Sequence, residues 1–374
     1  MIRILHIYSG NLYGGIETLL LTLAEKSYLC PEMKLEFALC FDARLSREMS
    51  EIQPVHMLGA VRLRYPWTWA RARRRLRDVL TAGNFDLVVC HSPWSQAIFG
   101  PVVRRMGLPL IFSIHDATDG RFWLERWARR TTPDLVLCNS QFTTTTLLGL
   151  YPGTPIAHIY WPVSSAPQLS AAACRNIRAE LQTPESDVVI IQVSRLERWK
   201  GHLLHLEALS RIADLPDWTC WQVGGPQKEK ETEYLTEIEA CANRLGIKHR
   251  IRFPGQRKDV GALLAAADIH CQPNMEPEPF GRTFIEALAA GLPVVTTRMG
   301  AAVEIVDSSC GILVPPADPD SLAEALRTLA SNGDLRRRYG AAGRARAEQL
   351  CNPPRQLAVL RDIFTSVLSR SLAA

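Results

Sequence analysis

The sequence contains no long hydrophobic run. No stretch of its 374 residues approaches the roughly 20 consecutive apolar residues of a membrane-spanning helix. The apolar segment at the N-terminus is short and leads into a glycine pair, Gly14 and Gly15, rather than into a small-residue cleavage site. We therefore interpret it as a first buried strand and not as a secretory signal.

Paired cysteine motifs and low-complexity segments are also missing. The ten cysteines are scattered and form no CxxC pair, which is typical of buried thiols in a reducing compartment rather than of disulfides or a zinc site. The composition, 47% hydrophobic and 22% charged, is that of a folded globular chain. At roughly 100–200 residues per domain, the length favours two domains. We expect a cytoplasmic protein without a metal site.

The positive charge is concentrated in the first half of the chain. Residues 1–165 contain 18 Lys and Arg against 13 Asp and Glu, whereas the remainder contains 25 of each kind. Arginine and aromatic residues are interleaved in two segments, Arg62–Arg77 and Arg121–Arg130. Such segments are either solvated helix faces or patches that meet an anionic lipid surface or a phosphate-bearing acceptor. No nucleic-acid-binding motif accompanies them.

Short apolar segments alternate with helical patterns along the whole chain. The predicted strands are Ile2–Tyr8, Leu35–Phe41, Leu87–Cys90, Leu110–Ile114, Leu135–Cys138, Ile156–Tyr160, Val188–Val193, Thr219–Val223, Ile251–Phe253, Ile269–Gln272, Pro293–Thr296 and Gly311–Val314. The predicted helices include Glu17–Ser27, Trp67–Ala82, His202–Ile212, Lys230–Leu245, Thr283–Ala290, Ser321–Ser331 and Pro354–Leu372. This alternation indicates an α/β protein with parallel sheets covered by helices, in two Rossmann-like domains.

Proline and serine residues interrupt the alternation near Trp161–Cys174, which predicts the junction between the domains. We place the first domain at residues 1–165, the second at 166–353 and a C-terminal helix at 354–374. Doubly wound sheets bind ligands at the carboxyl ends of their strands, so two facing sheets would enclose a cleft.

The segment Asn274–Gly291, NMEPEPFGRTFIEALAAG, is the most specific in the chain. Glu278 follows a strand on a loop, and Glu286 lies within a helix that begins near Arg282. The free N–H groups and the positive dipole end at the start of that helix suit an anionic diphosphate, and Gly281 permits close backbone approach. Either glutamate alone would be typical of a solvated side chain, but the segment as a whole favours a binding site.

A second segment, Val193–His202 (VSRLERWKGH), places Arg195 and Lys200 after a strand. An arginine fork and a lysine point charge placed after a strand can together neutralise the charge of a phosphate-bearing ligand or leaving group. A basic pair of this kind is more often solvated when it occurs alone, so its interpretation depends on the glutamate-containing segment.

Two features of the first half complete the pattern. The glycine pair after the first strand is either a tight turn or a point of close approach to a ligand, but it is not the full GxGxxG of a dinucleotide binder. His115 and His91 each lie at the end of a predicted strand, where a lone histidine is often only a structural group.

Together these segments resemble the family 4 retaining glycosyltransferases. Glu278 and Glu286 match the E-x7-E motif of that family, and GLPVVTTRMGAAVEIV, which follows, is also similar. The resemblance implies the GT-B fold, in which two Rossmann-like domains face each other across a cleft. It further implies that the second domain holds most of a nucleotide-sugar donor, with the C-terminal helix packing back toward the first.

The resemblance also implies roles for single residues. Glu278 would contact the donor sugar, Glu286 the ribose hydroxyls, and His115 the transferred sugar, so we expect His115 and Glu278 to be catalytic, with no nucleophile assigned. The donor-binding residues that it implies are Gly15, Arg195, Lys200, Gly225, Arg257, Gly281, Arg282, Thr283, Phe284 and Glu286.

A few residues could have either a structural or a functional role. By resemblance, Gly225 lies near the nucleotide, Arg257 near the base and Glu304 near the donor end of the cleft. Asp318 and Asp320 form a DxD pattern, which we interpret as a helix start with Asp320 as the N-cap rather than as a metal site. The resemblance supports this choice, because such enzymes do not usually need a metal to hold the phosphates.

We therefore expect a glycosyltransferase, of the hexosyltransferase class, that uses a nucleotide-sugar donor and no further cofactor. UDP is preferred over GDP and ADP on family frequency alone. The acceptor would be an unidentified glycan or lipid-linked molecule in polysaccharide, glycolipid or glycoprotein assembly, and the basic first domain fits peripheral contact with the inner membrane face. A nucleotide-sugar epimerase of the same fold and a binding protein without catalysis are the alternatives.

Overall fold

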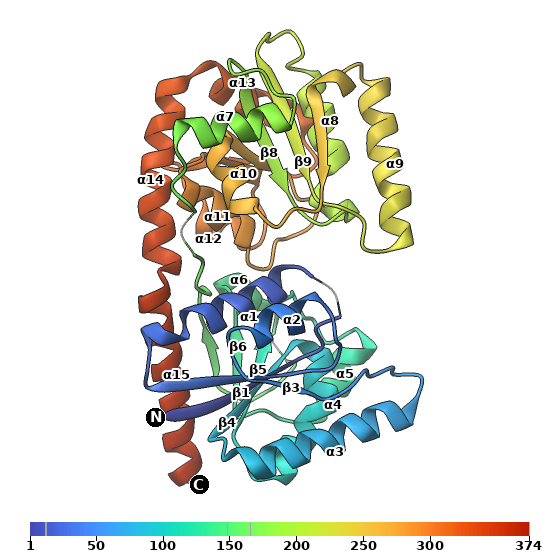
Figure 1. Ribbon diagram of the computed structural model, residues 1–374, viewed down its shortest axis with the longest axis vertical. Helices are drawn as coiled ribbons and strands as arrows, with labels where there is room; N and C mark the ends of the chain where they lie inside the picture. The colour runs from blue at the N-terminus through green and yellow to red at the C-terminus, as the bar shows by residue number, and fades with distance from the viewer. Residues whose placement is uncertain (12, 148, 165, 374) are drawn as a thin grey trace. The chain divides into compact units, whose positions relative to one another are not determined.

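The structure is a computed structural model that describes residues 1–11, 13–147, 149–164 and 166–373. Ser165 and Ala374, at which we placed domain ends, lie outside the described residues. The chain divides into two compact units, each with one sheet (Figure 1). Unit 1 comprises Met1–Val163 and the C-terminal segment from Cys351, and unit 2 comprises Ser164–Leu350.

The sheet of unit 1 has seven parallel strands in the order β3-β2-β1-β4-β5-β6-β7. The strands are β1 (Ile2–Tyr8), β2 (Met33–Leu39), β3 (Val55–Met57), β4 (Leu87–His91), β5 (Leu110–Ile114), β6 (Leu135–Cys138) and β7 (Ile156–His158). The inner strands are almost wholly buried because helices cover both faces of the sheet, and continuous apolar runs are typical of such strands.

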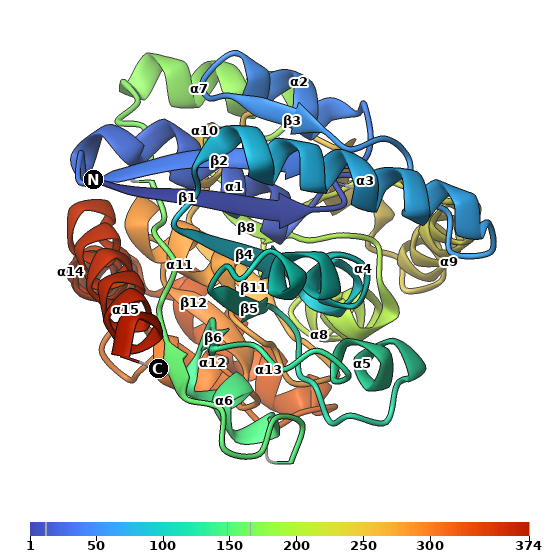
Figure 2. The same cartoon turned by 90° about the horizontal axis from the view of Figure 1, so that it is seen from below.

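Seven α-helices accompany the sheet in the described part of unit 1. They are α1 (Gly15–Lys26), α2 (Arg44–Ser50), α3 (Pro66–Gly83), α4 (Ser92–Arg105), α5 (Trp123–Ala128), α6 (Gln141–Thr146) and α15 (Pro353–Ala373). Helices α3 and α4 bury Leu76 and Phe99 in the same cluster as Leu5 of β1. Figure 2 shows these helices and the strands of the sheet from below. Helix α15 places Phe364 near His6 of the same strand, with ring centroids 6.4 Å apart. Since Leu5 and His6 are consecutive, these helices cover opposite faces of the sheet.

Unit 2 has six parallel strands in the order β10-β9-β8-β11-β12-β13. They are β8 (Val188–Val193), β9 (Trp218–Val223), β10 (Ile251–Gly255), β11 (Ile269–Gln272), β12 (Val294–Thr297) and β13 (Gly311–Val314). Its helices in the described residues are α7 (Ala171–Glu180), α8 (His202–Ser210), α9 (Glu229–Arg244), α10 (Val260–Ala266), α11 (Arg282–Ala290), α12 (Ala302–Ile305), α13 (Pro319–Ser331) and α14 (Gly333–Cys351). From β8 the chain first adds β9 and β10 on one side and then β11, β12 and β13 on the other. The carboxyl ends of β8 and β11 therefore form a topological switch point.

Several predicted elements need correction. The second strand is Met33–Leu39 and not Leu35–Phe41, and β3 was not predicted, because its three residues contain no apolar run. Helix α13 is capped by Asp318 and not by Asp320, since the Asp318 carboxylate accepts the N–H groups of Asp320 and Ser321. Asp320 lies inside the first turn, after Pro319 at the first helical position, where proline is favoured.

No helix within the described ranges combines the length and the low polarity needed to cross a lipid bilayer. All ten cysteines are free thiols, and nine of them are buried.

Candidate functional site

Two loops at the carboxyl edge of the unit 2 sheet bring the strongest predicted residues together. One follows β8 and ends in a 3-10 turn at Arg198–Lys200, and the other follows β11. The Met275 N–H donates to the Trp199 carbonyl at 2.6 Å and joins the loops directly. The Gln192 side chain, on β8, donates to the Lys200 carbonyl at 2.9 Å and fixes the turn to the sheet.

Gly201, after the turn, allows the loops to meet this closely. Its φ of +72° lies in the left-handed region, and a Cβ atom there would lie 1.8 Å from the Pro273 carbonyl oxygen. No side chain can be accommodated against another backbone at that distance, so glycine is required for the position of Lys200.

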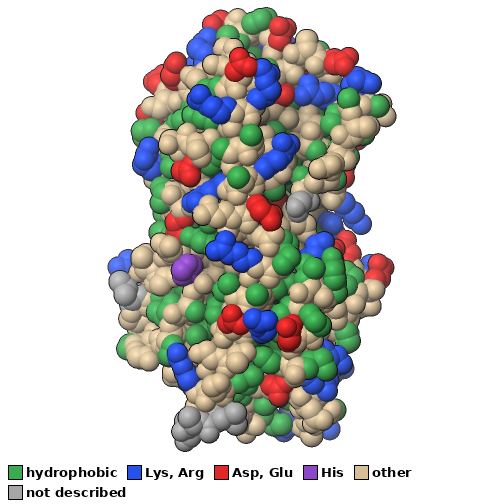
Figure 3. Space-filling model, turned by 90° about the vertical axis from the view of Figure 1, so that its left-hand side faces the viewer, with side chains coloured by type: hydrophobic (Ala, Val, Ile, Leu, Met, Phe, Trp, Pro, Cys, Tyr) green, Lys and Arg blue, Asp and Glu red, His purple; other side chains and the backbone are tan. Residues whose placement is uncertain are grey.

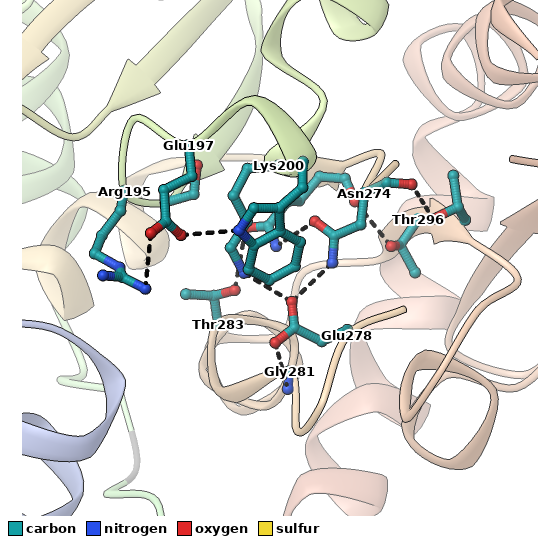
Figure 4. Close-up of polar contacts among 12 residues, drawn as sticks. Arg195, Glu197, Lys200, Asn274, Glu278, Gly281, Thr283 and Thr296 are labelled. Atoms are coloured by element: carbon teal, nitrogen blue, oxygen red, sulfur yellow. Dashed lines mark hydrogen bonds and ion pairs between the residues drawn. The ribbon is translucent and has the colours of Figure 1, made fainter. Parts of the chain in front are cut away.

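The Glu278 carboxylate lies at the centre of this edge, as Figure 4 shows. One oxygen, Oε2, accepts from Lys200 Nζ at 2.8 Å and from Asn274 Nδ2 at 2.7 Å, and the other accepts from the Gly281 N–H at 3.2 Å. Burial disfavours the charged form of Glu278, but the ammonium group of Lys200 and these donors outweigh it, and the pKa of Glu278 is lowered from its ordinary value. The structure thus holds a charged carboxylate in a buried place.

Helix α11 begins directly beside this carboxylate. Gly281 is its N-cap with φ +79°, and a Cβ atom there would lie 2.5 Å from the ring of Phe284, which is fully buried. Thr283 in the first turn donates a long hydrogen bond of 3.4 Å to Gln272 of β11. The positive end of the helix dipole therefore lies at the same edge as Lys200, an arrangement that favours anion binding.

The two predicted arginines of these motifs are each paired with a neighbouring carboxylate. Arg195 contacts Glu197 at 3.1 Å, and its side chain is 40% exposed. Arg282 donates to Glu286 at 2.8 Å, one turn along α11. A carboxylate thus balances each of the three cations at this edge, Lys200, Arg195 and Arg282. An anion that binds here would replace these carboxylate contacts with its own.

Two predicted donor-binding residues have structural reasons to be present. A Cβ atom on Gly225 would lie 2.8 Å from the backbone nitrogen of Gln256, so the close approach of the segments that follow β9 and β10 already requires a small residue. Arg257 donates to both oxygens of Asp259 and to Glu180, and these carboxylates raise its pKa. Contact of either residue with a nucleotide stays a prediction.

The predicted residues of unit 1 lie at the carboxyl edge of its own sheet. Gly15 follows β1 as the first residue of α1, where a Cβ atom would meet open space, so packing gives no reason for glycine there. Glu17 fixes this turn, because it accepts from the Gly14 N–H at 2.9 Å and from the Tyr8 hydroxyl at 2.8 Å. The glycine pair is therefore a rigid turn with space beside it.

His115 directly follows β5 and is 7% exposed. Its Nε2 atom lies 2.9 Å from Nδ1 of His91, and its ring stacks on Trp161 with centroids 6.0 Å apart. Burial lowers the pKa of His115 to about 3 and that of His91 well below its ordinary value, so both rings are neutral near pH 7. A neutral imidazole can bind sugar hydroxyls without adding charge.

Sequence reasoning missed two residues of the unit 2 site. Asn274 bonds to Glu278, and Trp199 presents its ring face 3.7 Å from Lys200 Nζ while its N–H donates to Glu197 at 3.0 Å. Each lies inside one of the two motifs quoted above. Their positions, an amide near Glu278 and an aromatic ring next to Lys200, could have indicated that they contact these charged side chains. Within the described residues, no group of three or more His, Cys, Asp or Glu side chains is arranged to hold a metal ion.

Two family models match the chain, one for each half. "Glycosyltransferase Family 4" matches residues 13–166, and "Glycosyl transferases group 1" matches residues 174–346. The second interval contains every charged residue of the unit 2 site described above.

Curated relatives point the same way. A phosphatidyl-myo-inositol mannosyltransferase from Mycobacterium leprae is 29% identical over 309 residues, which cover 78% of this chain and 75% of the relative. A lipopolysaccharide core biosynthesis glycosyltransferase, LpsE, from Rhizobium meliloti is 30% identical over 167 residues, 44% of this chain and 46% of the relative. The match to LpsE thus spans less than half of each protein.

The fold also matches solved structures. The crystal structure of HepE from Anabaena in complex with UDP and glucose superposes with a TM-score of 0.87, covering 98% of this chain and all of HepE, at 24% sequence identity. A glycosyltransferase from Rickettsia africae gives a TM-score of 0.85 at 20% identity, with 98% of each chain covered. At this identity the likeness concerns the fold.

Proposed function

Since the chain belongs to the family 4 glycosyltransferases of GT-B fold and is therefore a glycosyltransferase, we propose that it transfers a sugar with retention of configuration from a nucleoside diphosphate sugar. The acceptor would be a hydroxyl group of a growing glycan or glycolipid. The observation that carries the proposal is the convergence of Lys200, Glu278 and the start of α11 on one edge of the unit 2 sheet.

The chemistry places a demand on each of these groups. As the acceptor oxygen bonds to the anomeric carbon, the bond from that carbon to the diphosphate breaks, and the diphosphate takes the electron pair. The proton of the acceptor hydroxyl passes to the departing phosphate. Lys200, Arg195 and the first-turn N–H groups of α11 would neutralise the developing charge, which is the largest single contribution in many enzymes.

Further roles are proposed for the uncharged or paired groups. Glu278 would accept a hydrogen bond from a hydroxyl of the donor sugar, and Glu286 would accept hydrogen bonds from the ribose hydroxyls. Neutral His115 of unit 1 would bind the transferred sugar in the transition state. Gly15, with open space beside it, would allow a ligand to approach the backbone. No residue is assigned as a nucleophile.

We favour a uridine nucleotide in the donor. The support is indirect: the HepE structure with the same fold was solved with UDP and glucose. Calorimetric titration of UDP, GDP and ADP and their glucose and mannose conjugates tests this choice directly. We expect UDP and its sugar conjugates to bind more tightly than the others. Tighter binding of GDP or ADP would show that the donor carries guanine or adenine instead of uracil.

Product analysis tests the reaction. After incubation with donor and a hydroxyl-bearing acceptor, proton NMR of the new glycosidic bond should show the anomeric configuration of the donor. Inversion would remove the retaining assignment. Conversion of the nucleotide sugar to an isomer without any acceptor would favour the epimerase of the same fold.

We also propose that unit 1 contacts an anionic membrane through α3 and α5. All seven arginines of the segment 62–77 lack an ion pair within the described residues, in contrast to the paired arginines of unit 2. They are Arg62, Arg64, Arg71, Arg73, Arg74, Arg75 and Arg77. Exposed aromatic rings accompany them, with Trp67 62%, Phe122 54% and Trp123 48% exposed. This composition fits the headgroup region of a lipid surface.

The two helices contact each other through their aromatic side chains. Trp69 of α3 contacts Trp127 of α5 with ring centroids 6.2 Å apart, and Trp127 stacks on Trp123 at 6.4 Å. The face of the molecule shown in Figure 3 differs, because acidic and basic side chains are interspersed there. The names of two relatives refer to phosphatidyl-myo-inositol and to lipopolysaccharide core biosynthesis, which agrees with a lipid-linked acceptor.

Vesicle sedimentation tests the membrane proposal. At about 1 kcal/mol per basic residue near the surface, Arg74→Glu with Arg77→Glu should weaken binding to phosphatidylglycerol vesicles by about 30-fold or more. The matched reversal of Lys230 and Arg338, both exposed in unit 2, should change it little. Equal binding to neutral and anionic vesicles would contradict the proposal.

A further inference from the structure

Three buried histidines form a row across unit 1. His6 lies in β1, His91 ends β4 and His115 follows β5, and these strands are neighbours in the sheet. His6 pairs in register with Val89, and His91 with Ser113. Each histidine therefore lies two residues nearer the carboxyl edge than the previous one and on the same face of the sheet.

The rings contact one another through their nitrogens. Nδ1 of His6 lies 2.9 Å from Nε2 of His91, and Nδ1 of His91 lies 2.9 Å from Nε2 of His115. Both pairs are stacked with centroids 5.2 Å apart. The Ser113 hydroxyl lies 3.2 Å from the same Nε2 of His115. Hydrogen bonds thus run unbroken from the middle of β1 to the carboxyl edge.

Each ring in the row carries one proton. Burial lowers the pKa of His6 and His115 to about 3 and that of His91 well below its ordinary value, so none is charged near neutral pH. A neutral imidazole has one donor nitrogen and one acceptor nitrogen. The row therefore has two consistent arrangements, in which all three protons are on Nδ1 or all three are on Nε2.

The far end of the row distinguishes the two arrangements. Within the described residues, Nε2 of His6 is buried without a hydrogen-bond partner. The ring centroid of His6 lies 5.4 Å from that of Phe37 and 6.4 Å from that of Phe364 of α15. With the protons on Nε2, His6 would bury an N–H that has no acceptor. With the protons on Nδ1, it leaves only an acceptor unsatisfied, and buried acceptors without partners are less rare than buried donors without them.

We propose that His6 and His91 are positioning residues that hold His115 with its proton on Nδ1. Nε2 of His115 is occupied by His91 and Ser113, whereas Nδ1 is neither buried nor bonded within the described residues. His115 then presents a fixed N–H donor at the edge of the sheet. This inference rests on the proposed function, in which the Nδ1–H donor of His115 would bind an oxygen of the transferred sugar. The aromatic surroundings of His6, which include Phe364 of α15, decide which ring nitrogen carries the proton along the row.

The tautomer can be measured without any substrate. Long-range proton–nitrogen NMR spectra of the full chain, labelled with 15N-histidine, report which ring nitrogen carries the proton. Substitution of each histidine by glutamine assigns the signals. We expect His6, His91 and His115 all to be protonated on Nδ1. A proton on Nε2 of His115, or a mixture of the two forms, would overturn the proposal.

Two substitutions at His91 test the consequence for turnover. His91→Gln keeps an N–H that can donate to His115, whereas His91→Met removes it and frees the tautomer. We expect His91→Met to lower kcat about tenfold, the value of one modest hydrogen bond, with little change in KM, and His91→Gln to restore most of it. His56→Gln is the control, because His56 pairs with Glu36 outside the row. Equal kcat in both His91 variants would contradict the positioning role.

The design separates failure of the inference from failure of the proposed function. If His115→Gln leaves turnover unchanged while the spectra show Nδ1–H, the function proposed for His115 is wrong and the row still sets its tautomer. If His115→Gln abolishes turnover while the spectra show Nε2–H, the function survives and the inference is wrong. Because the spectra are recorded on the unsubstituted chain, a variant that fails to fold does not prevent the test.

Discussion

Replacing Lys200 by methionine should destabilise unit 2 before any ligand is considered. Methionine keeps the length and apolar stem of lysine but removes the ammonium group that lies 2.8 Å from Glu278. The two side chains are only 13% and 10% exposed, so the carboxylate would remain buried without its counter-ion. Removing one partner of a buried ion pair costs about 3–5 kcal/mol. Two donors remain, from Asn274 and Gly281, so we expect the lower end, about 3 kcal/mol.

Native-state hydrogen exchange on the intact chain is the appropriate assay, because two units need not unfold together. At about 1.4 kcal/mol per factor of ten, a loss of about 3 kcal/mol speeds exchange of the slowest amides in β8 and β11 by roughly 150-fold. Peptides from β1 and β4 of unit 1 provide an internal control and should exchange at the same rate as in the parent protein.

The double variant Lys200→Met with Glu278→Gln isolates the pair. It removes both charges and leaves a neutral amide that can still accept one hydrogen bond, so most of the lost stability should return, to within about 1 kcal/mol of the parent. A loss under about 1 kcal/mol in the single variant, or a double variant no more stable than the single one, would refute the idea that Lys200 compensates the Glu278 charge.

The remaining predictions concern the same edge of the sheet. Because the folded-state pKa of Glu278 is lowered, its charge stabilises unit 2 above the ordinary pKa of 4.5, and this contribution is lost as the pH falls through the folded value. Urea unfolding measured at several pH values should show that loss of stability. Glu278→Gln should make the free energy of unfolding less dependent on pH over the same range. Gly201→Ala should cost more than about 1 kcal/mol and weaken donor binding, since a Cβ atom would meet the Pro273 carbonyl; unchanged calorimetric affinity would contradict this geometry. Arg195→Ala should weaken donor binding by about 10–100-fold, whereas Arg257→Ala, which removes an arginine already paired with two carboxylates, should mainly lower the melting temperature; the reverse result would exchange their roles.

The strands were the most predictable part of the fold. Strands β1, β5, β6, β8, β11 and β13 have the predicted bounds, because each is rich in apolar residues and is followed by a polar or turn residue. Strand β3 was not predicted, since Val55–Met57 is short and only half-buried at the sheet edge. Helix α14, which was not among the predicted helices, is rich in arginine and depends on tertiary contact, such as Gly340 against the Gly291 backbone.

The site was predicted as segments and not as a network. The motif spacing indicated Lys200 and Glu278 separately, as two groups that would each meet the donor. Their direct contact joins residues 78 positions apart, and nothing in local periodicity encodes a pairing of that kind. The loop crossing at Gly201 and Pro273, which sets the contact, likewise depends on the order β8-β11 in the sheet.

This network also bears on the chemistry that Glu278 can perform. A carboxylate offers about four lone-pair positions, and three are already taken by Lys200, Asn274 and the Gly281 N–H. The charge is stabilised by these donors, and a carboxylate held in this way attacks carbon poorly, because it must first give up its bonds to the lysine and the amide. One position remains for a hydroxyl proton of a bound sugar. The geometry therefore supports a proposal in which Glu278 binds and orients the donor sugar, and in which the acceptor oxygen, rather than an enzyme carboxylate, forms the new bond.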